Sequence, residues 1–180
     1  MTTQAISKWN LDATHSEVQF KVKHLVISTV SGHFQKFEGS LEANEADFSD
    51  AKIKFSADVN SIDTNNEQRD GHLKSDDFFN AEKFPSLTFV SKELKKEGLN
   101  NYKLIGDFTI RDITKTITLE TEYTGLAIDP WGNTKIGFEV TGKINRLDYD
   151  LKWNALTEAG GAVVSSEIKL ALNIQLVKNA

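Results

Sequence analysis

Apolar and polar residues alternate with a period of two along most of this sequence. In residues 17–24, Val18, Phe20 and Val22 are each followed by a polar residue. Successive side chains of a β-strand point to opposite faces, so this pattern predicts a strand with one buried face and one face in water. The predicted strands cover residues 17–24, 30–43, 52–59, 87–91, 102–111, 116–123, 135–144 and 168–176.

The segments between the predicted strands contain turn-forming residues. Residues 95–101 and 129–133 supply the Gly, Asn and Pro that reversing strands need. Eight antiparallel strands with one apolar face must form a sandwich or close into a barrel, because a flat sheet would leave that face in water. Long strands and short turns favour the barrel. We therefore expect an all-β fold, an eight-stranded antiparallel β-barrel.

One stretch, residues 64–84, breaks the alternation. Thr64 and Glu67 have the spacing of a capping box, which satisfies free backbone amides at the start of a helix. Ser75, followed by two acidic residues, is suited to begin a second short turn. The apolar side of this segment is formed by Phe78, Phe79 and Phe84. The sequence predicts a short helical insert that packs against the barrel as a lid or plug.

Composition and charge exclude several classes of function. A chain of 180 residues can bury a core without a disulfide or a metal, and we expect one domain over residues 1–180 and no cofactor. Its 21 Lys and Arg residues are interspersed with 26 Asp and Glu residues, which argues against a nucleic-acid partner and against an anionic-membrane patch. The absence of cysteine excludes a thiol nucleophile, an iron–sulfur cluster and cysteine-ligated zinc.

The sequence as written also carries no targeting signal. Residues 1–9 lack the apolar core of a signal peptide, and no run approaches the roughly 18 apolar residues of a membrane span. We therefore expect a soluble cytoplasmic protein, or a periplasmic one if a signal peptide has been removed.

No combination of residues points to catalysis or to metal binding. His15 and Ser16 are adjacent, but neighbouring residues of a strand point to opposite faces, so they should not pair as base and nucleophile. The histidines, which are His15, His24, His33 and His72, have no spacing that places two metal ligands on one face. Most carboxylates fall in turns or on the solvated face of strands. We expect no catalytic residue and no metal site, with His15 and His33 in structural or surface positions.

The predicted inward face of the strands is rich in phenylalanine. Its large members are Phe20, Phe34, Phe55, Phe89, Phe108, Phe138, Val22, Val59, Leu104, Ile110 and Val140. Its small members are Ala57, Gly106 and Gly142. An eight-stranded barrel is either filled by its own side chains or holds one small ligand, and the sequence leaves both interpretations open. The inward glycines and the polar groups of His24, Arg69 and Ser91 favour a cavity with a head-group site, although His24 also suits a hydrogen-bonded core position.

Specific motifs span nearly the whole chain. Residues 9–25 read Trp-x-Leu-Asp-x-x-His-Ser-x-Val-x-Phe-x-Val-x-His-Leu, and residues 30–39 read Val-x-Gly-x-Phe-x-x-Phe-x-Gly. Residues 69–73 read Arg-Asp-x-His-Leu, and residues 84–91 read Phe-Pro-x-x-x-Phe-x-Ser. At these spacings the chain resembles the YceI-like proteins, which are described as lipocalin-like barrels that bind polyisoprenoid chains.

This resemblance implies a lipocalin-like barrel whose lumen holds a long isoprenoid chain. For the family's Arg-Asp-x-His motif it implies a head-group role for Arg69, Asp70 and His72, with a structural tie between helix and barrel rim as the alternative for Arg69 and Asp70. The residues expected to bind the ligand are Phe20, Val22, His24, Phe34, Phe55, Val59, Arg69, His72, Phe89, Ser91, Leu104, Phe108, Ile110, Phe138 and Val140.

The chain departs from the family pattern in one predicted hairpin. Where the family commonly has Gly and Pro, this sequence has Asp112 and Thr116. Asp tolerates a left-handed turn conformation and Thr suits the start of a strand, so the change affects the loop shape and leaves the fold intact. Relatives often carry a secretory signal and are often dimers, but no apolar stripe on the predicted outer face requires a homodimer here.

The sequence and the resemblance together predict a protein that binds, transports or stores a polyisoprenoid or a similar long-chain amphiphilic lipid. Polyprenyl phosphate and isoprenoid quinone are the expected types of ligand. Two alternatives remain at this point: an enzyme that modifies a lipid-like substrate in the lumen, and a filled barrel whose outer surface serves as a scaffold.

Overall fold

The computed structural model describes residues 6–25, 27–44, 47–153 and 164–179. Its strands are β1 (Ser7–Leu11), β2 (Glu17–His24), β3 (Ser28–Phe34), β4 (Phe37–Ala43), β5 (Lys52–Asp58), β6 (Ile62–Asp63), β7 (Ser86–Lys96), β8 (Asn101–Ile110), β9 (Ile113–Ile128), β10 (Thr134–Asn145) and β11 (Val164–Lys178). The α-helix is α1 (Glu67–Lys74), and the 3₁₀ turns are η1 (Ala13–His15), η2 (Val59–Ser61) and η3 (Arg146–Tyr149).

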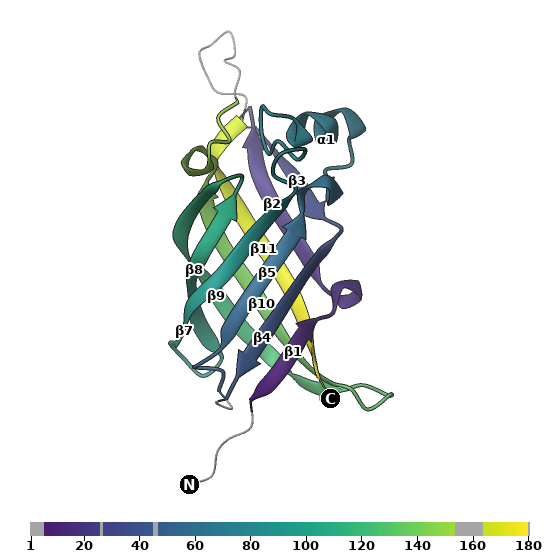
Figure 1. The fold of residues 1–180 in the computed structure, drawn as a ribbon, viewed down its shortest axis with the longest axis vertical. Helices are drawn as coiled ribbons and strands as arrows, with labels where there is room; N and C mark the ends of the chain where they lie inside the picture. The colour runs from purple at the N-terminus through teal and green to yellow at the C-terminus, as the bar shows by residue number, and fades with distance from the viewer. Residues whose placement is uncertain (1–5, 26, 45–46, 154–163, 180) are drawn as a thin grey trace.

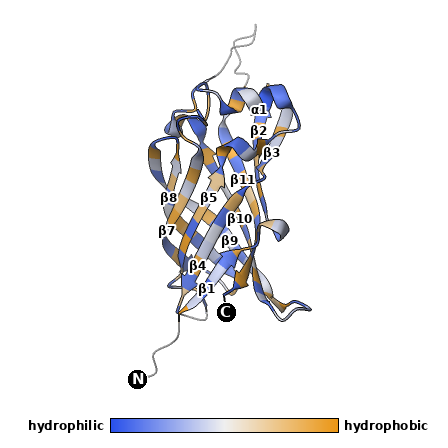
Figure 2. Cartoon of the chain, turned by 45° about the vertical axis from the view of Figure 1, so that its right-hand side comes forward, coloured by the Kyte–Doolittle hydropathy of each residue, from blue (hydrophilic) through white to orange (hydrophobic). Residues whose placement is uncertain are grey.

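The sheet closes into a barrel, as the alternation predicts. The ring runs β1-β4-β5-β7-β8-β9-β10-β11, and β11 pairs with β1 to complete eight antiparallel strands. β11 is shared, because its last residues pair with β1 while most of its length pairs with β2. β3 and β6 extend the sheet from β2 at the end that carries α1 (Figure 1). The alternation shows along the strands as hydrophobic and hydrophilic bands (Figure 2).

Some predicted boundaries are wrong. The strand predicted over residues 30–43 is divided at Gln35 and Lys36, where the Gln35 amide donates to the Ser61 carbonyl and the Lys36 amide donates to the Ser61 hydroxyl. These two amides bond to Ser61 and not to a neighbouring strand, so the chain can bend from β3 into β4. In the β8–β9 turn the left-handed residue is Arg111, with a φ of 56°, and not Asp112.

The helical insert is shorter than predicted. α1 is capped by Asn66, whose side chain accepts a hydrogen bond from the Arg69 amide at 2.9 Å, so Thr64 is not the N-cap. Residues 75–84 form turns, as predicted after Ser75, and do not extend the helix. The Ser75 hydroxyl donates to the His72 carbonyl at the end of α1. The insert nevertheless lies across one end of the barrel (Figure 1). Within the described residues, no helix is long and apolar enough to cross a membrane.

Aromatic side chains close the opposite end of the barrel. Phe48, in the β4–β5 loop, packs against Trp9, Tyr123 and Phe138 with ring centroids 5.8 to 6.2 Å apart. The Tyr102 hydroxyl donates to the Asp47 carbonyl at 2.6 Å and holds the same loop in place. We call these five aromatic residues the plug. The interior therefore has one closed end, and α1 lies at the other.

Candidate ligand cavity

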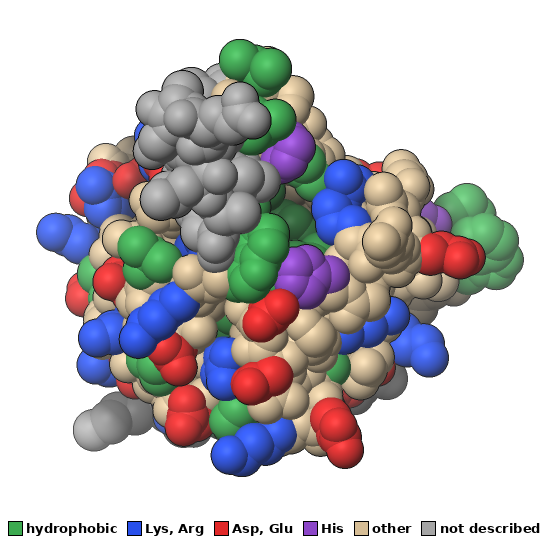
Figure 3. Space-filling model, turned by 90° about the horizontal axis from the view of Figure 1, so that it is seen from above, with side chains coloured by type: hydrophobic (Ala, Val, Ile, Leu, Met, Phe, Trp, Pro, Cys, Tyr) green, Lys and Arg blue, Asp and Glu red, His purple; other side chains and the backbone are tan. Residues whose placement is uncertain are grey.

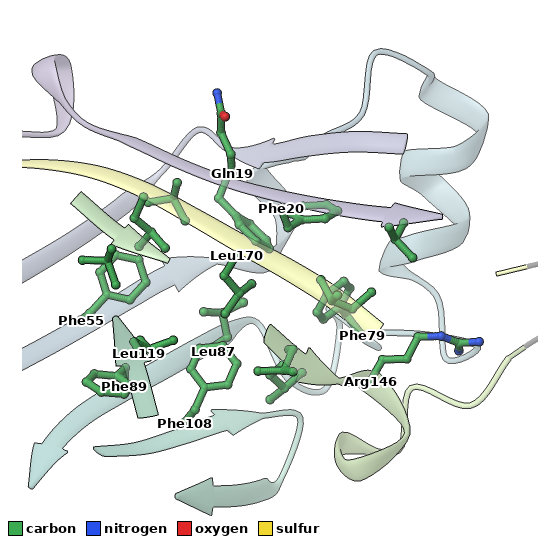
Figure 4. Close-up of a pocket in the computed structure, with 18 of the residues that line it drawn as sticks. Gln19, Phe20, Phe55, Phe79, Leu87, Phe89, Phe108, Leu119, Arg146 and Leu170 are labelled. Atoms are coloured by element: carbon green, nitrogen blue, oxygen red, sulfur yellow. The ribbon is translucent and has the colours of Figure 1, made fainter. Parts of the chain in front are cut away.

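An apolar cavity of about 570 Å³ lies inside the barrel. This volume falls within the range of about 300–1,000 Å³ that is typical of small-molecule sites in proteins. Phe20 of β2, Phe89 of β7 and Leu119 of β9 reach it from separate strands (Figure 4). The filled-core interpretation is therefore wrong for the described part of the interior.

Most of the residues predicted to bind a ligand line this cavity. They are Phe20, Val22, His24, Phe34, Phe55, Arg69, His72, Phe89, Leu104, Phe108, Ile110, Phe138 and Val140. Their inward direction follows from the register, in which Phe89 lies opposite Phe108 and Phe55. Placement on the wall shows that these side chains can contact a ligand, and their role in binding stays a prediction.

Val59 and Ser91 lie outside the cavity lining. Strand β5 ends at Asp58, so the alternation that predicts an inward Val59 stops one residue too early, and Val59 packs in the core within η2. Ser91 lies at a bulge of β7, where its hydroxyl accepts a hydrogen bond from the Ile53 amide at 2.8 Å. A bulge changes the direction of successive side chains, which period-two counting does not anticipate.

The inward glycines do not create the cavity. A Cβ at Gly106 would collide with the ring of Phe89, and a Cβ at Gly142 would collide with the side chain of Leu119. Phe89 therefore fills the space beside Gly106, and Leu119 fills the space beside Gly142. Both of these larger side chains line the cavity wall. This corrects the expectation that the glycines indicate empty volume.

Several lining residues are absent from the predicted set. The alternating apolar residues of β11 face the cavity, and they are Ile168, Leu170, Leu172, Ile174 and Leu176. Their alternation is visible in the sequence and could have identified them. Arg146, Leu151 and Trp153 also line the cavity, but they lie in and after η3, where no periodic pattern marks the side that faces inward.

The mouth of the cavity lies at the end that carries α1. Figure 3 looks onto this end and shows a hollow with hydrophobic side chains inside it and with histidine, basic and acidic side chains around its edge. His24, Arg69 and His72 line the cavity here. Of the polar groups predicted for a head-group site, His24, Arg69 and His72 are therefore grouped at the open end, whereas Ser91 lies outside the lining. The plug closes the apolar end.

The Arg-Asp-x-His motif makes structural contacts at this mouth. Arg69 donates from Nε to the Thr64 hydroxyl at 2.7 Å, and the Asp70 carboxylate accepts from the Thr64 amide at 2.9 Å. These bonds tie the first turn of α1 to the segment after β6. His72 Nε2 lies 2.8 Å from the Asp77 carboxylate, and its ring lies edge-on to Trp153 at 4.7 Å. The structural tie thus exists, and Arg69 and His72 still contribute to the cavity wall.

Arg146 is a buried cation at the rim. Its side chain is labelled in Figure 4, and the residue is only 2% exposed. The guanidinium donates to the carbonyls of Ser165 at 2.8 Å, Trp153 at 2.9 Å, Val164 at 3.1 Å and also Leu151. Among the described residues it forms no ion pair with a carboxylate. Burial lowers the pKa of Arg146, and four backbone carbonyls solvate its charge.

Thr121 places a polar group inside the apolar wall. Its hydroxyl is buried, lines the cavity and has no hydrogen-bond partner within the described chain. A buried hydroxyl without a partner costs roughly 1–3 kcal/mol, so this oxygen is available to a water or to an oxygen of a ligand. The surrounding wall is otherwise predominantly apolar.

His15 and Ser16 have separate partners, as predicted, but they lie in and directly after η1 and not on a strand. The His15 ring lies at the surface with Nδ1 2.8 Å from the Asp12 carboxylate, whereas the buried Ser16 hydroxyl accepts from the Gln175 amide at 2.9 Å. His33 Nε2 lies 3.9 Å from the Asp63 carboxylate, which agrees with a surface role. The described residues contain no group of three or more His, Asp or Glu side chains arranged to hold a metal.

A closed antiparallel barrel with one open end and an apolar cavity defines a β-barrel of the lipocalin-like class. A comparison with known protein families identifies the particular family. The sequence model of the YceI-like domain family matches residues 9–176, and the chain belongs to this family.

Relatives and solved structures agree with this assignment. A UPF0312 protein of Staphylococcus epidermidis is 38% identical over 165 residues, which are 91% of this chain and 94% of the relative. The crystal structure of the Campylobacter jejuni YceI protein has a TM-score of 0.73 and 32% identity, covering 89% of this chain and 91% of its own. A Saccharophagus degradans structure described as a polyisoprenoid-binding domain has a TM-score of 0.72 at 16% identity, covering 95% and 98% of the two chains, and shows the shared fold.

Proposed function

We propose that this protein binds a polyisoprenoid or a similar long-chain amphiphilic lipid in the barrel and acts as its carrier or store. The observation that carries the proposal is the apolar cavity of about 570 Å³, closed by the plug at one end and open at the other. Each buried CH₂ contributes about 0.8 kcal/mol, so a long chain gains affinity with each added unit. The description of the Saccharophagus degradans relative as polyisoprenoid-binding supports this choice of ligand.

The two ends of the cavity suggest the orientation of the ligand. The hydrocarbon chain lies toward the plug, where Phe138 and Leu94 line the wall. The head group lies at the mouth beside Arg69, His24 and His72, which supply hydrogen-bond donors and positive charge. Polyprenyl phosphate and an isoprenoid quinone both have this division into a polar head and an apolar tail.

Binding is favoured over catalysis by the character of the wall. The lining residues are predominantly apolar. The buried cation Arg146 is not free to act on a substrate, because backbone carbonyls occupy its guanidinium. The alternative of an enzyme that modifies a lipid in the lumen has no comparable support.

A pair of tryptophan substitutions tests the proposal. Phe108→Trp places a larger ring in the cavity wall, whereas Val90→Trp adds a ring on the exposed face of β7. We expect Phe108→Trp to reduce the uptake of detergent-solubilised polyprenyl phosphate and ubiquinone, measured by native mass spectrometry, and Val90→Trp to leave it unchanged. Overpacking can lower the free energy of unfolding by about 1–3 kcal/mol. Urea unfolding of each variant therefore checks that it is folded. Unchanged uptake by a folded Phe108→Trp protein argues against a lipid in this cavity.

A further inference from the structure

The turn between β2 and β3 exposes large aliphatic side chains. Ile27 is 85% exposed, and Leu25 is 37% exposed with a φ of 54°. Turns normally carry Gly, Asn, Asp or Ser, and a leucine in the left-handed region is unusual. Neither side chain fills the core. Apolar residues in an exposed and sterically demanding turn indicate a surface with a function.

This turn adjoins the mouth of the cavity. β2 ends at His24, which lines the cavity and pairs with Val164, another lining residue, at the start of β11. Lys23 lies beside it and also borders the cavity. In Figure 1 the β2–β3 turn is at the end of the barrel that carries α1. The apolar turn therefore lies at the end through which a ligand would enter.

Lysines gather on the outer wall below the same turn. Lys21 of β2 lies opposite Lys169 of β11, and Lys169 lies opposite Lys143 of β10. Like charges directly across a sheet are destabilising. Lys143 is offset by Glu167 at 3.3 Å, but among the described residues Lys21, Lys23 and Lys169 form no ion pair.

The register explains why the sequence did not predict this cluster. Acidic and basic residues alternate along the chain, which argued against an anionic-membrane patch. The three lysines of the row come from three separate strands, and only the pairing of β10, β11 and β2 brings them together. The cluster is a property of the fold.

We propose that Leu25 and Ile27, together with the adjacent lysines, dock the open end of the barrel on an anionic lipid bilayer. Aliphatic side chains enter the interface while lysines approach anionic head groups, which is the general pattern of interfacial membrane binding. A bilayer is the favoured partner because the apolar turn, the lysines and the mouth lie at one end. A lipid then passes between bilayer and lumen without crossing water. This surface goes beyond lumen binding, since it concerns where the ligand is exchanged.

The closed end supplies a matched control. Leu99, in the β7–β8 turn, is 86% exposed, and Trp131, in the β9–β10 turn, is 83% exposed. The plug separates the closed end from the cavity, so docking there gives a ligand no entry. Leu99→Asp and Ile27→Asp change the same property at opposite ends of the molecule.

Vesicle flotation tests the proposal with phosphatidylcholine vesicles and with phosphatidylcholine vesicles that contain phosphatidylglycerol. We expect the intact chain to bind the anionic vesicles, Ile27→Asp to weaken this binding at least about tenfold, and Leu99→Asp to leave it unchanged. The double variant Lys21→Gln, Lys169→Gln should weaken binding about fivefold per charge on anionic vesicles only, and added salt should do the same.

Three results would overturn the docking surface: no binding of the intact chain to anionic vesicles, undiminished binding by Ile27→Asp, or an equal loss with Leu99→Asp. Lipid uptake from detergent micelles separates this outcome from failure of the lumen proposal. Ile27→Asp should take up detergent-solubilised polyprenyl phosphate as the intact chain does, because Ile27 does not line the cavity.

Discussion

Arg146 shows how one residue can organise the rim of the cavity. A buried charge is costly unless hydrogen bonds compensate it, and here four backbone carbonyls do so. They come from the segment after η3 and from the first residues of β11, so one guanidinium holds two parts of the rim together. Trp153, whose carbonyl accepts one of these bonds, also packs against His72. The contact therefore links the rim to α1.

Replacing this guanidinium should destabilise the fold. We expect Arg146→Met to lower the free energy of unfolding by about 3 kcal/mol, because it leaves buried carbonyls without donors. Arg146→Lys should lower it less, since an ammonium keeps the charge but reaches fewer carbonyls. Lys152→Met, at an exposed lysine nearby, is the control. Urea unfolding measures all three, and an Arg146→Met protein as stable as the original chain would contradict this role.

At the scale of elements, Asp12 joins η1 to β10 and β11. Its amide donates to the Gln175 carbonyl at 2.8 Å, and its carboxylate accepts from Thr14, lies 2.8 Å from His15 Nδ1 and lies 3.1 Å from Lys135 Nζ. Burial raises the pKa of Asp12, but hydrogen bonds from Thr14, His15 and Lys135 together lower it more, so it lies well below its usual range. The ionised form stabilises the seam where β1 meets β11.

This lowered pKa predicts the direction of a pH dependence. A carboxylate with a depressed folded pKa contributes stability above its unfolded pKa of about 3.9 and loses it as the pH falls toward the folded value. We expect Asp12→Asn to lower the free energy of unfolding by about 1–3 kcal/mol near neutral pH. The gap between the two proteins should narrow below about pH 4. Urea unfolding across this range measures the gap, and a gap independent of pH would rule out the ionised seam.

Strands were predictable where alternation repeats often enough to be recognised, although β7 and β9 extend well beyond predicted residues 87–91 and 116–123. β2 and β10 match predicted residues 17–24 and 135–144 closely. β1, with five residues, is too short to show a period, yet it closes the ring through Trp9 and Lys178. Val59 and Ser91 were misplaced because a strand ended and a bulge intervened. Arg146 was missed because its position depends on carbonyls that only the folded chain brings together.

At the scale of the whole molecule, the two ends of the cavity differ in access and in polarity. The plug blocks one end, whereas polar side chains, α1 and the β2–β3 turn surround the other. A site that serves a long amphiphile needs such a division, because the tail must leave water while the head keeps polar contacts. The strands supply most of the apolar wall through alternation, whereas the end of β2 and the helix α1 supply the polar groups His24, Arg69 and His72 at the mouth.

Lipid in the lumen is the central claim, and native mass spectrometry of the purified protein tests it most directly. Organic extraction then identifies whatever is released. We predict one long-chain isoprenoid lipid per chain, either already bound or taken up from added polyprenyl phosphate or quinone. A folded protein that shows only its own mass, and that takes up none of the added lipids, would contradict the account.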